Sequence, residues 1–383
     1  MSKLLIDVTR LVSRLMDGRL PTGVDRVGLA YVQYYGRISR AVIRWAGHSW
    51  VLPEEQSKQL FTWLIKHESS KGAVKIIATG IARGWYRQRT AGQILFNTGH
   101  SGLENIRYPT MLKHMGVRPV FVVHDLIPIT HPEYSRPGEA EKHIQRMDQM
   151  LSLASGVVAN SLATLDDLST YAKKSAKPLP PSTIGLLAPG MQPLLPGARP
   201  IAAPYFVMLS TIEPRKNHVM ILQIWRRLIE TYGDQAPRLI VIGQRGWECE
   251  NVIDLLERCI QLKGYVTELS RCSDQELVTY LHHSQALLFP SFAEGYGMPL
   301  VEALALGTPV IASDLSVFRE IADDIPEYVD PLDGIRWAEL VIDYARPEGK
   351  NREAQLVRMQ NFKVPDWSEH FSMVDALIER LEQ

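Results

Sequence analysis

The sequence SFAEGYGMPLVEALALGTPVIASD occupies residues 291–314 and says more about the fold than any other part of the chain. The apolar run QALLFP before it predicts a buried strand, LVEALAL within it predicts a helix, and PVIAS predicts another strand. A glycine-containing turn and a helix therefore separate two buried strands. This order is typical of a parallel sheet covered by helices.

The same alternation extends through the whole chain. In the second half, strands are predicted at 205–210, 238–243, 285–290 and 309–313, and helices at 219–231, 250–262 and 300–306. In the first half, a helix is predicted at 24–35 and strands at 3–8, 41–45, 93–97, 119–124 and 156–160. Residues 177–204 are rich in proline with interspersed glycine, which disfavours a helix and predicts an interdomain connection. We therefore predict two α/β sheets in tandem.

Composition places the chain among globular proteins that stay inside the cell. Its 383 residues are 45% hydrophobic and 22% charged, and they suffice for two domains. Its 3 cysteines have no metal-ligand spacing, which favours a reducing compartment. The first residues, MSKLLIDVTRLVSRL, carry charges within the apolar run and do not form a signal peptide. No uncharged stretch is long enough to cross a bilayer, so we expect a cytoplasmic protein.

The charge is distributed unevenly. Residues 1–120 hold 18 Lys and Arg against 7 Asp and Glu, whereas the rest of the chain holds 24 against 35. A basic half joined to an acidic half suggests that one domain faces an anionic surface. Nucleic acid is one candidate and a layer of phospholipid headgroups is the other.

Two loops at predicted strand ends carry charged groups suited to a nucleotide sugar. Arg215 and Lys216, in TIEPRKN, lie at a strand-to-helix turn, where helix amides favour phosphate. The alternative for them is a solvated pair of surface cations. Glu294 lies in a glycine-containing turn and Glu302 lies about one turn into the next helix, so both can accept hydrogen bonds from one ligand. The alternative for these two acids is an N-cap carboxylate and an exposed helix glutamate.

Residues 291–314 closely resemble the signature of glycosyltransferase family four, whose retaining enzymes have the GT-B fold. The segments TIEPRKN, LIVIGQRGW, FVVHDLIPITHPEY and LPTGVDRV resemble further motifs of that family. The resemblance implies two Rossmann-like domains that face each other across a cleft. Residues 1–195 would form the acceptor-side domain, with a helix at 366–383 packing back on it, and residues 204–365 would bind the donor.

The resemblance also implies a role for each motif residue. Arg215 and Lys216 would hold the diphosphate, and Glu294 would bind the donor sugar. With His124, which would approach that sugar from the first domain, they form the expected catalytic set. The residues expected around the nucleotide sugar are Gly23, Ser210, Gly243, Tyr265, Val266, Gly295, Tyr296, Gly297, Met298 and Glu302.

His124 ends a predicted strand, and a histidine in that position is more often a satisfied core residue than a catalyst. Its place in the expected cleft favours a binding role over general base catalysis. The chain also departs from the family in two places. Ser210 and Thr211 replace a frequent Gly-Arg pair, and residues 267–273 look longer than the usual link before the next helix.

The resemblance implies attack on the same face of the donor sugar, with the acceptor proton passing to the leaving diphosphate. Arg215, Lys216 and helix amides would stabilise the charge of that leaving group. The sequence holds no Asp-x-Asp triplet and no His or Cys cluster at ligand spacing, so we expect no metal and no other cofactor.

The sequences HDLIPI and EPRKN resemble those of mannosyl- and rhamnosyl-type transferases of surface polysaccharides. We therefore expect a GDP-sugar donor, GDP-mannose first, and a saccharide or polyprenyl-diphosphate-linked acceptor. Residues 72–90 combine isoleucines, Trp85, Tyr86 and four cations, which fits either an amphipathic segment on the inner-leaflet anionic lipid or an ordinary surface segment. Nucleic acid is not an expected partner, because no recognition motif accompanies the charge. The sequence does not indicate the oligomeric state.

Other readings remain open. A UDP- or dTDP-sugar donor with a soluble acceptor would use the same fold and chemistry, and a catalytically silent binding module would keep the fold alone. A hydrolysing epimerase is disfavoured by the long EGYGMP signature. A nicotinamide dehydrogenase is disfavoured because G-x-G-x-x-G is missing after the first predicted strand.

Overall fold

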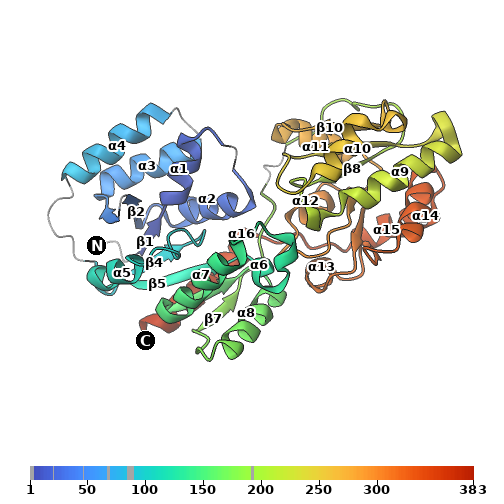
Figure 1. The fold of residues 1–383 in the computed structure, drawn as a ribbon. Coiled ribbons are helices and arrows are strands. Elements are labelled where there is room, and N and C mark those ends of the chain that lie inside the picture. The colour runs from blue at the N-terminus through green and yellow to red at the C-terminus, as the bar shows by residue number, and fades with distance from the viewer. Residues whose placement is uncertain (1–3, 20, 46, 67–69, 84–89, 191–193) are drawn as a thin grey trace. The chain divides into compact units, whose positions relative to one another are not determined.

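The computed structural model describes residues 4–19, 21–45, 47–66, 70–83, 90–190 and 194–383. The chain divides into two compact units, each an α/β sheet with helices (Figure 1). Unit 1 comprises Met1–Ile129, Gly138–Leu187 and Asp366–Gln383, and unit 2 comprises Thr130–Pro137 and Ala188–Pro365. In the described part of the chain, no helix is both long and apolar enough to cross a membrane.

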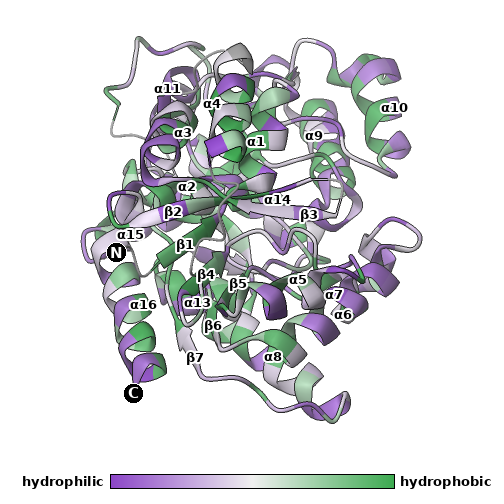
Figure 2. Ribbon diagram, turned by 90° about the vertical axis from the view of Figure 1, so that its left-hand side faces the viewer, coloured by the Kyte–Doolittle hydropathy of each residue, from purple (hydrophilic) through white to green (hydrophobic). Residues whose placement is uncertain are grey.

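Unit 1 contains a seven-stranded sheet that is parallel except at one edge. In spatial order its strands are β3 (His48–Val51), β2 (Ser39–Trp45), β1 (Leu4–Asp7), β4 (Ile94–Asn97), β5 (Arg118–Val123), β6 (Gly156–Ala159) and β7 (Ser182–Ile184). The edge strand β3 pairs with β2 in the antiparallel sense. The central strands are buried on both sides and are coloured as hydrophobic in Figure 2, as expected for a sheet covered on both faces.

Helices cover both faces of this sheet. They are α1 (Thr9–Met16), α2 (Gly23–Tyr35), α3 (Glu54–Lys66), α4 (Ser70–Arg83), α5 (Tyr108–Met115), α6 (Ile127–Thr130), α7 (Glu139–Leu153), α8 (Leu162–Lys174) and α16 (Trp367–Glu382). Successive side chains of a strand point to opposite faces. Leu95 of β4 accordingly packs in a cluster with residues of α5, α7 and α8, while Phe96 contacts Tyr31 and Tyr35 of α2.

Helix α16 returns from the end of unit 2 to complete unit 1. Its buried residues Phe371, Val374, Leu377 and Leu381 recur at helical spacing and form one apolar stripe. Phe371 packs edge-on against Tyr31, and a Cβ at Gly156 would meet Leu381. The helix therefore belongs to the core of unit 1.

Unit 2 contains a six-stranded parallel sheet. In spatial order its strands are β10 (Val266–Leu269), β9 (Arg238–Ile242), β8 (Tyr205–Leu209), β11 (Leu287–Phe289), β12 (Val310–Ser313) and β13 (Glu327–Val329). Its helices are α9 (His218–Tyr232), α10 (Glu250–Arg258), α11 (Asp274–His283), α12 (Met298–Ala305), α13 (Ser316–Ala322), α14 (Gly334–Ala345) and α15 (Lys350–Met359). The strand residues Phe206 and Met208 pack with α9 and α14 around the fully buried Trp225 and Trp337.

The connection predicted at 177–204 contains a strand that the composition does not indicate. Ser182–Ile184 form β7, which pairs with β6, and the carbonyl of Pro181 accepts a hydrogen bond from Val157. A three-residue strand at the edge of a sheet tolerates adjacent prolines, because one side of it needs no partner. The division between the units falls after Leu187, so residues 188–190 and 194–195 lie in unit 2.

Both sheets reverse their strand order at one place. In unit 2 the chain runs outward from β8 through β9 to β10 and then starts again at β11 on the other side of β8. In unit 1 the corresponding reversal lies between β1 and β4. Ligands of open α/β sheets bind at the carboxyl ends of the strands next to such a switch point.

Candidate donor site

The switch point of unit 2 brings together the two charged loops that the sequence singles out. The loop after β8 contains the 3-10 turn Pro214–Lys216, and the loop after β11 runs from Pro290 to Gly297. The amide of Phe292 donates to the carbonyl of Arg215 at 2.8 Å, which fixes one loop against the other.

Arg215, Lys216 and Glu294 form one ion cluster. Nη1 of Arg215 lies 2.8 Å from Oε2 of Glu294, and Nζ of Lys216 bonds to the other carboxylate oxygen. Ser291 donates its hydroxyl to the same oxygen at 2.7 Å. The Nε of Arg215 also pairs with Glu213 at 2.7 Å. These groups are held in fixed positions, as a site for a charged ligand requires.

Burial makes this cluster electrostatically strong. Although burial raises the pKa of Glu294, the neighbouring Arg215 and Lys216 lower it to about 2. Burial, together with Arg215, lowers the pKa of Lys216, and burial raises the pKa of Glu213. Interactions between such charges are little screened by solvent, so they are stronger than equivalent pairs on the surface.

Ser210 and Gly243 form the base of the site, at the ends of β8 and β9. A Cβ at Gly243 would lie 1.9 Å from the carbonyl oxygen of Ser210, so only glycine allows the two chains to approach this closely. Both of these sequence-predicted residues therefore lie beside the loop that contains Arg215 and Lys216, called the phosphate loop below for its expected ligand.

The glycine turn leads into α12. Gly295, Tyr296, Gly297 and Met298 follow Glu294 directly, and Gly297 is the residue before the helix. Glu302 is buried within α12, where Oε1 accepts a hydrogen bond from the amide of Gly190 at 3.2 Å. The structure therefore places these residues on one loop and helix next to Arg215 and Lys216.

Aromatic contacts that the sequence does not indicate flank the cluster. The ring of Tyr134 stacks on Phe292, with centroids 5.5 Å apart, and the guanidinium of Arg136 lies 5.2 Å from the ring centroid of Trp247. Tyr134 and Arg136 belong to the short segment Thr130–Pro137 of unit 2. The motif FVVHDLIPITHPEY includes Tyr134, but the sequence gives no sign that this residue contacts Phe292.

Tyr265 and Val266 are not brought together with the cluster. Val266 is the first residue of β10 and pairs with Leu239 at the start of β9, so both residues lie at the amino edge of the sheet. The hydroxyl of Tyr265 bonds to Asp234, and Arg238 lies over its ring. The residues at the carboxyl end of β10 are Ser270, Arg271 and Cys272. Residues 267–273 look longer than the usual link before α11 because residues 267–269 belong to β10.

His124 lies in unit 1, directly after β5. Its Nε2 is 2.6 Å from the carbonyl oxygen of Thr98, which can only accept, so Nε2 carries the proton. Burial lowers the pKa of His124, and the ring is therefore neutral near pH 7. Among the described residues Nδ1 has no partner, which leaves a lone pair able to accept from a hydroxyl. Gly23 is the first residue of α2, whose N-terminus is capped by Thr22 and Asp25.

The described residues include no group of three or more His, Cys, Asp or Glu side chains arranged to hold a metal ion.

Comparisons with known proteins identify the second half of the chain. Residues 198–332 match the family described as Glycosyl transferases group 1. The chain is 29% identical over 279 residues to the serotype-specific mannosyltransferase WbdA of Escherichia coli, covering 66% of this chain and 34% of WbdA. It is 33% identical over 129 residues to O-antigen chain mannosyltransferase B of Escherichia coli, covering 34% of this chain and 33% of that protein. The match thus spans about a third of each relative.

Solved structures show the same fold. HepE from Anabaena, in complex with UDP and glucose, superposes with a TM-score of 0.64 at 14% identity and covers 100% of both chains. Sucrose-phosphate synthase from Thermosynechococcus elongatus superposes with a TM-score of 0.62 at 16% identity, over 99% of this chain and 98% of that chain. The predicted fold class, GT-B with two Rossmann-like α/β units, is confirmed.

Proposed function

Because residues 198–332 match the group 1 glycosyltransferases, we propose that the chain transfers a hexose from a nucleotide diphosphate sugar to a saccharide or polyprenyl-diphosphate-linked acceptor. The names of its relatives support mannose as the sugar and surface polysaccharide as the product. GDP-mannose is the favoured donor.

The cluster of Arg215, Lys216 and Glu294 at the switch point of unit 2 is the observation that carries this proposal. The buried Lys216 and the half-buried Arg215 suit the diphosphate of the donor, and a carboxylate held at 2.8 Å from Arg215 suits the hydroxyls of its sugar. A surface pair of cations would be solvated, whereas Lys216 is 7% exposed. The burial favours the binding site over the solvated pair.

The residues of the cluster would act mainly on the leaving group. As the bond between the anomeric carbon and the diphosphate breaks, negative charge builds on the diphosphate oxygens. Arg215 and Lys216 stabilise that charge from positions fixed before the reaction. The acceptor hydroxyl attacks from the same face, forms the new glycosidic bond and passes its proton to the leaving diphosphate. Retention and independence from metal are both part of this proposal.

His124 would bind the donor sugar rather than act as a base. Its lowered pKa keeps it neutral, and its unpartnered Nδ1 can accept a hydrogen bond from a sugar hydroxyl. In the same way, Glu302 would bind the ribose and Gly23 would leave room for phosphate and acceptor.

The nucleotide base would lie at the carboxyl end of β10, against Ser270, Arg271 and Cys272. Ligands of parallel sheets bind at that edge, and the phosphate loop lies there too. Tyr265 and Val266 begin the strand at the opposite edge and are not part of this proposal.

Attachment to the inner leaflet would involve α4 in unit 1. The helix exposes Val74 (51%) and carries Lys75 and Arg83, while Ile76, Ile77 and Ile81 are half-buried. Trp85, Tyr86, Arg87 and Arg89 lie outside the described residues. Vesicles with and without anionic lipid test this proposal: retention that needs the anionic lipid and weakens with salt supports it, and no retention at low salt contradicts it.

The function is tested by titrating the protein with GDP-mannose, UDP-glucose, UDP-GlcNAc and dTDP-rhamnose while following the melting temperature and nucleotide release. A donor present at 100 times its Kd stabilises the folded state by about 2.7 kcal/mol. GDP-mannose should give the largest shift, and a UDP-sugar in its place would assign the alternative donor.

Lys216→Met is the matched variant, because it keeps the length of the side chain and removes the charge. We expect turnover to fall by about 100-fold or more. Lys263→Ala removes an exposed lysine of unit 2 and should leave turnover unchanged. Binding of GDP without any turnover would indicate a catalytically silent module, and equal turnover in both variants would contradict the assigned site.

A further inference from the structure

Unit 1 contains a cavity of about 140 Å³ that the donor chemistry does not use. It lies where three neighbouring strands end: Thr9 follows β1, Trp45 ends β2, and Asn105 lies in the loop after β4. This edge includes the switch point of the first sheet, between β1 and β4. The cavity is therefore in the position where open α/β sheets bind ligands.

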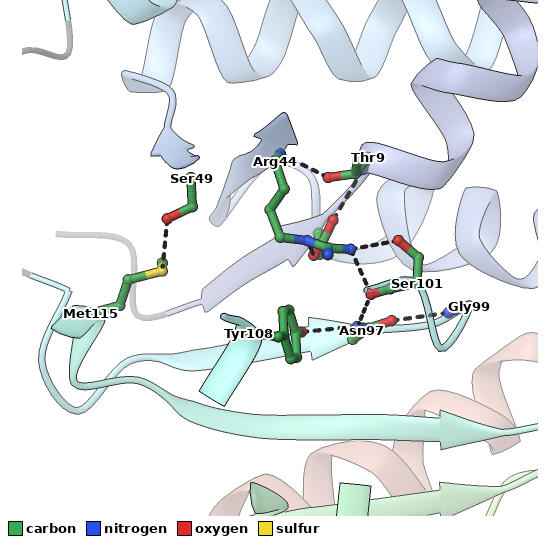
Figure 3. Close-up of polar contacts among 9 residues, drawn as sticks. Thr9, Arg44, Ser49, Asn97, Gly99, Ser101, Tyr108 and Met115 are labelled. Carbon is green, nitrogen blue, oxygen red and sulfur yellow. Dashed lines mark hydrogen bonds and ion pairs between the residues drawn. The ribbon is translucent and has the colours of Figure 1, made fainter. Parts of the chain in front are cut away.

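Arg44 and Thr9, which line the cavity, belong to a half-buried polar network (Figure 3). Nε of Arg44 donates to Oδ2 of Asp7 at 2.6 Å, and Nη2 donates to the carbonyl of Ser101 at 2.6 Å. The backbone amide of Arg44 donates to Oγ1 of Thr9 at 2.9 Å, and its guanidinium lies over the ring of Tyr108. These bonds hold Arg44 in one orientation.

A glycine makes room for this guanidinium. Gly102 has a φ of +86°, and a Cβ there would lie 1.6 Å from Nη1 of Arg44. Another residue here would be strained by the positive φ and would displace the guanidinium. Arg44 is thus fixed both by hydrogen bonds and by the backbone of the loop after β4.

The wall of the cavity offers an aromatic surface and a cation. Trp45 lines the cavity and is 76% exposed, which leaves most of its large apolar ring open to solvent. Arg107 also lines the cavity, and its guanidinium has no ion pair and no hydrogen bond among the described residues. The described lining contains no carboxylate, and Asp7 already neutralises Arg44. Arg107 therefore leaves the cavity with a net positive charge, beside the exposed His48.

We infer that this cavity binds one saccharide unit that carries a carboxylate or a phosphate. The apolar face of a sugar ring packs on an indole, while a guanidinium binds either anion through two parallel hydrogen bonds. The volume suits a single sugar ring. The inference rests on the proposed function, since it makes the anionic sugar part of the acceptor.

Calorimetry or saturation-transfer NMR on the full chain tests this directly, with GDP present to fill the donor site. The probes are mannose 6-phosphate, glucuronate, methyl α-mannoside and inorganic phosphate. We expect mannose 6-phosphate or glucuronate to bind, and which of the two binds identifies the anion. Binding of neither one overturns the inference. Equal binding of methyl α-mannoside overturns the role of the anion, and equal binding of inorganic phosphate overturns the role of the ring.

Three variants locate the probe. Arg107→Ala and Trp45→Ala should each weaken binding about ten-fold or more, and Trp45→Phe should restore most of it. Lys113→Ala, which removes an exposed cation from the same helix as Tyr108, should have no effect. Binding that is unchanged in both Arg107→Ala and Trp45→Ala would contradict the assigned cavity. All of these variants should bind GDP normally, so a failure of the donor site is recognised separately.

Discussion

Arg215 and Glu294 are separated by 79 residues in the chain, and Nη1 of the first lies 2.8 Å from Oε2 of the second. Arg215 follows β8 and Glu294 follows β11. These two strands are parallel neighbours in the sheet, so both residues lie at its switch point. Two loops that resemble separate motifs therefore contribute to one ion cluster. The carboxylate of one loop neutralises cations of the other.

Glu294→Gln should destabilise unit 2 by about 3 kcal/mol and abolish turnover, because it removes the carboxylate that pairs with the buried Lys216 and leaves Arg215 with Glu213 alone. Urea unfolding at pH 7 measures the loss. The folded-state pKa of Glu294 is about 2, below its unfolded value of about 4.3. The stabilisation is therefore fully present above about pH 4.5 and is lost as the pH falls toward 2.

Glu353→Gln removes an exposed carboxylate of the same unit and serves as the control. A loss in Glu294→Gln no larger than in this control would show that the cluster does not hold the two loops together.

Gly243→Ala should destabilise the protein by about 3 kcal/mol or more, because the new methyl group would meet the carbonyl of Ser210. Gly334→Ala is the matched change, since the nearest atom to its Cβ would be 3.8 Å away. The test compares the melting temperatures of the two variants with that of the parent protein, and only Gly243→Ala should lower it. Similar values for both variants would mean that the end of β9 can move away from β8 at little cost.

Acid should destabilise the protein below pH 6.5 through buried neutral histidines. Burial lowers the pKa of His370 to about 4, and burial and Lys216 lower that of His218 to about 3. The unfolded chain takes up protons near pH 6.5, before the folded chain does, so stability falls as the pH falls. Each of these residues should cost about 2 kcal/mol at pH 5, relative to pH 7 or above.

Neither ring nitrogen of His218 has a hydrogen-bond partner among the described residues, so an apolar side chain suits its position. His218→Leu should flatten the dependence of unfolding free energy on pH between 7 and 5, whereas His114→Gln, at an exposed position, should not. An unchanged slope in His218→Leu would mean that this ring is protonated in the folded protein.

Cys272 should report on the nucleotide base. If the base lies at the carboxyl end of β10, GDP should slow maleimide labelling of Cys272 more than that of Cys259, which precedes the strand. Burial raises the pKa of Cys272 to about 11, so the labelling is best followed at pH 8.5 to 9. Protection of Cys259 alone would place the base at the opposite edge of the sheet.

The stacked rings of Tyr134 and Phe292 should be energetically coupled. A double-mutant cycle with Tyr134→Ala and Phe292→Ala should give a coupling energy of about 1 kcal/mol. The same cycle with Tyr134 and the distant exposed Val357→Ala should give none. Additivity in the first cycle would mean that Thr130–Pro137 is not held against the donor loop.

Much of the fold follows from local pattern. Strands β8, β9 and β12 were predictable because parallel strands buried on both faces are short continuous apolar runs between turns. The meeting of Arg215, Lys216 and Glu294 was predictable because each follows such a run, and strand ends of one direction share one edge of a sheet.

The misplaced parts have a common physical origin. Strand β10 (VTEL) and strand β7 (STI) are half-buried at or near sheet edges and carry polar residues, so no apolar run marks them. Because β10 begins at Val266, Tyr265 and Val266 lie at its amino end, and the proposed base contact is Ser270–Cys272 at its carboxyl end. The Arg44 network and the Tyr134 stack depend on contacts between distant segments, which a linear pattern does not encode.

Helix α16 has a consequence for the order of folding during synthesis. Residues up to Leu187 leave the ribosome long before Phe371 and Leu377, which complete their core, whereas Ala188–Pro365 form nearly all of unit 2 without interruption. The unit made second can thus reach its native state first, while the nascent first unit keeps the faces of β6 and β7 uncovered and open to a chaperone.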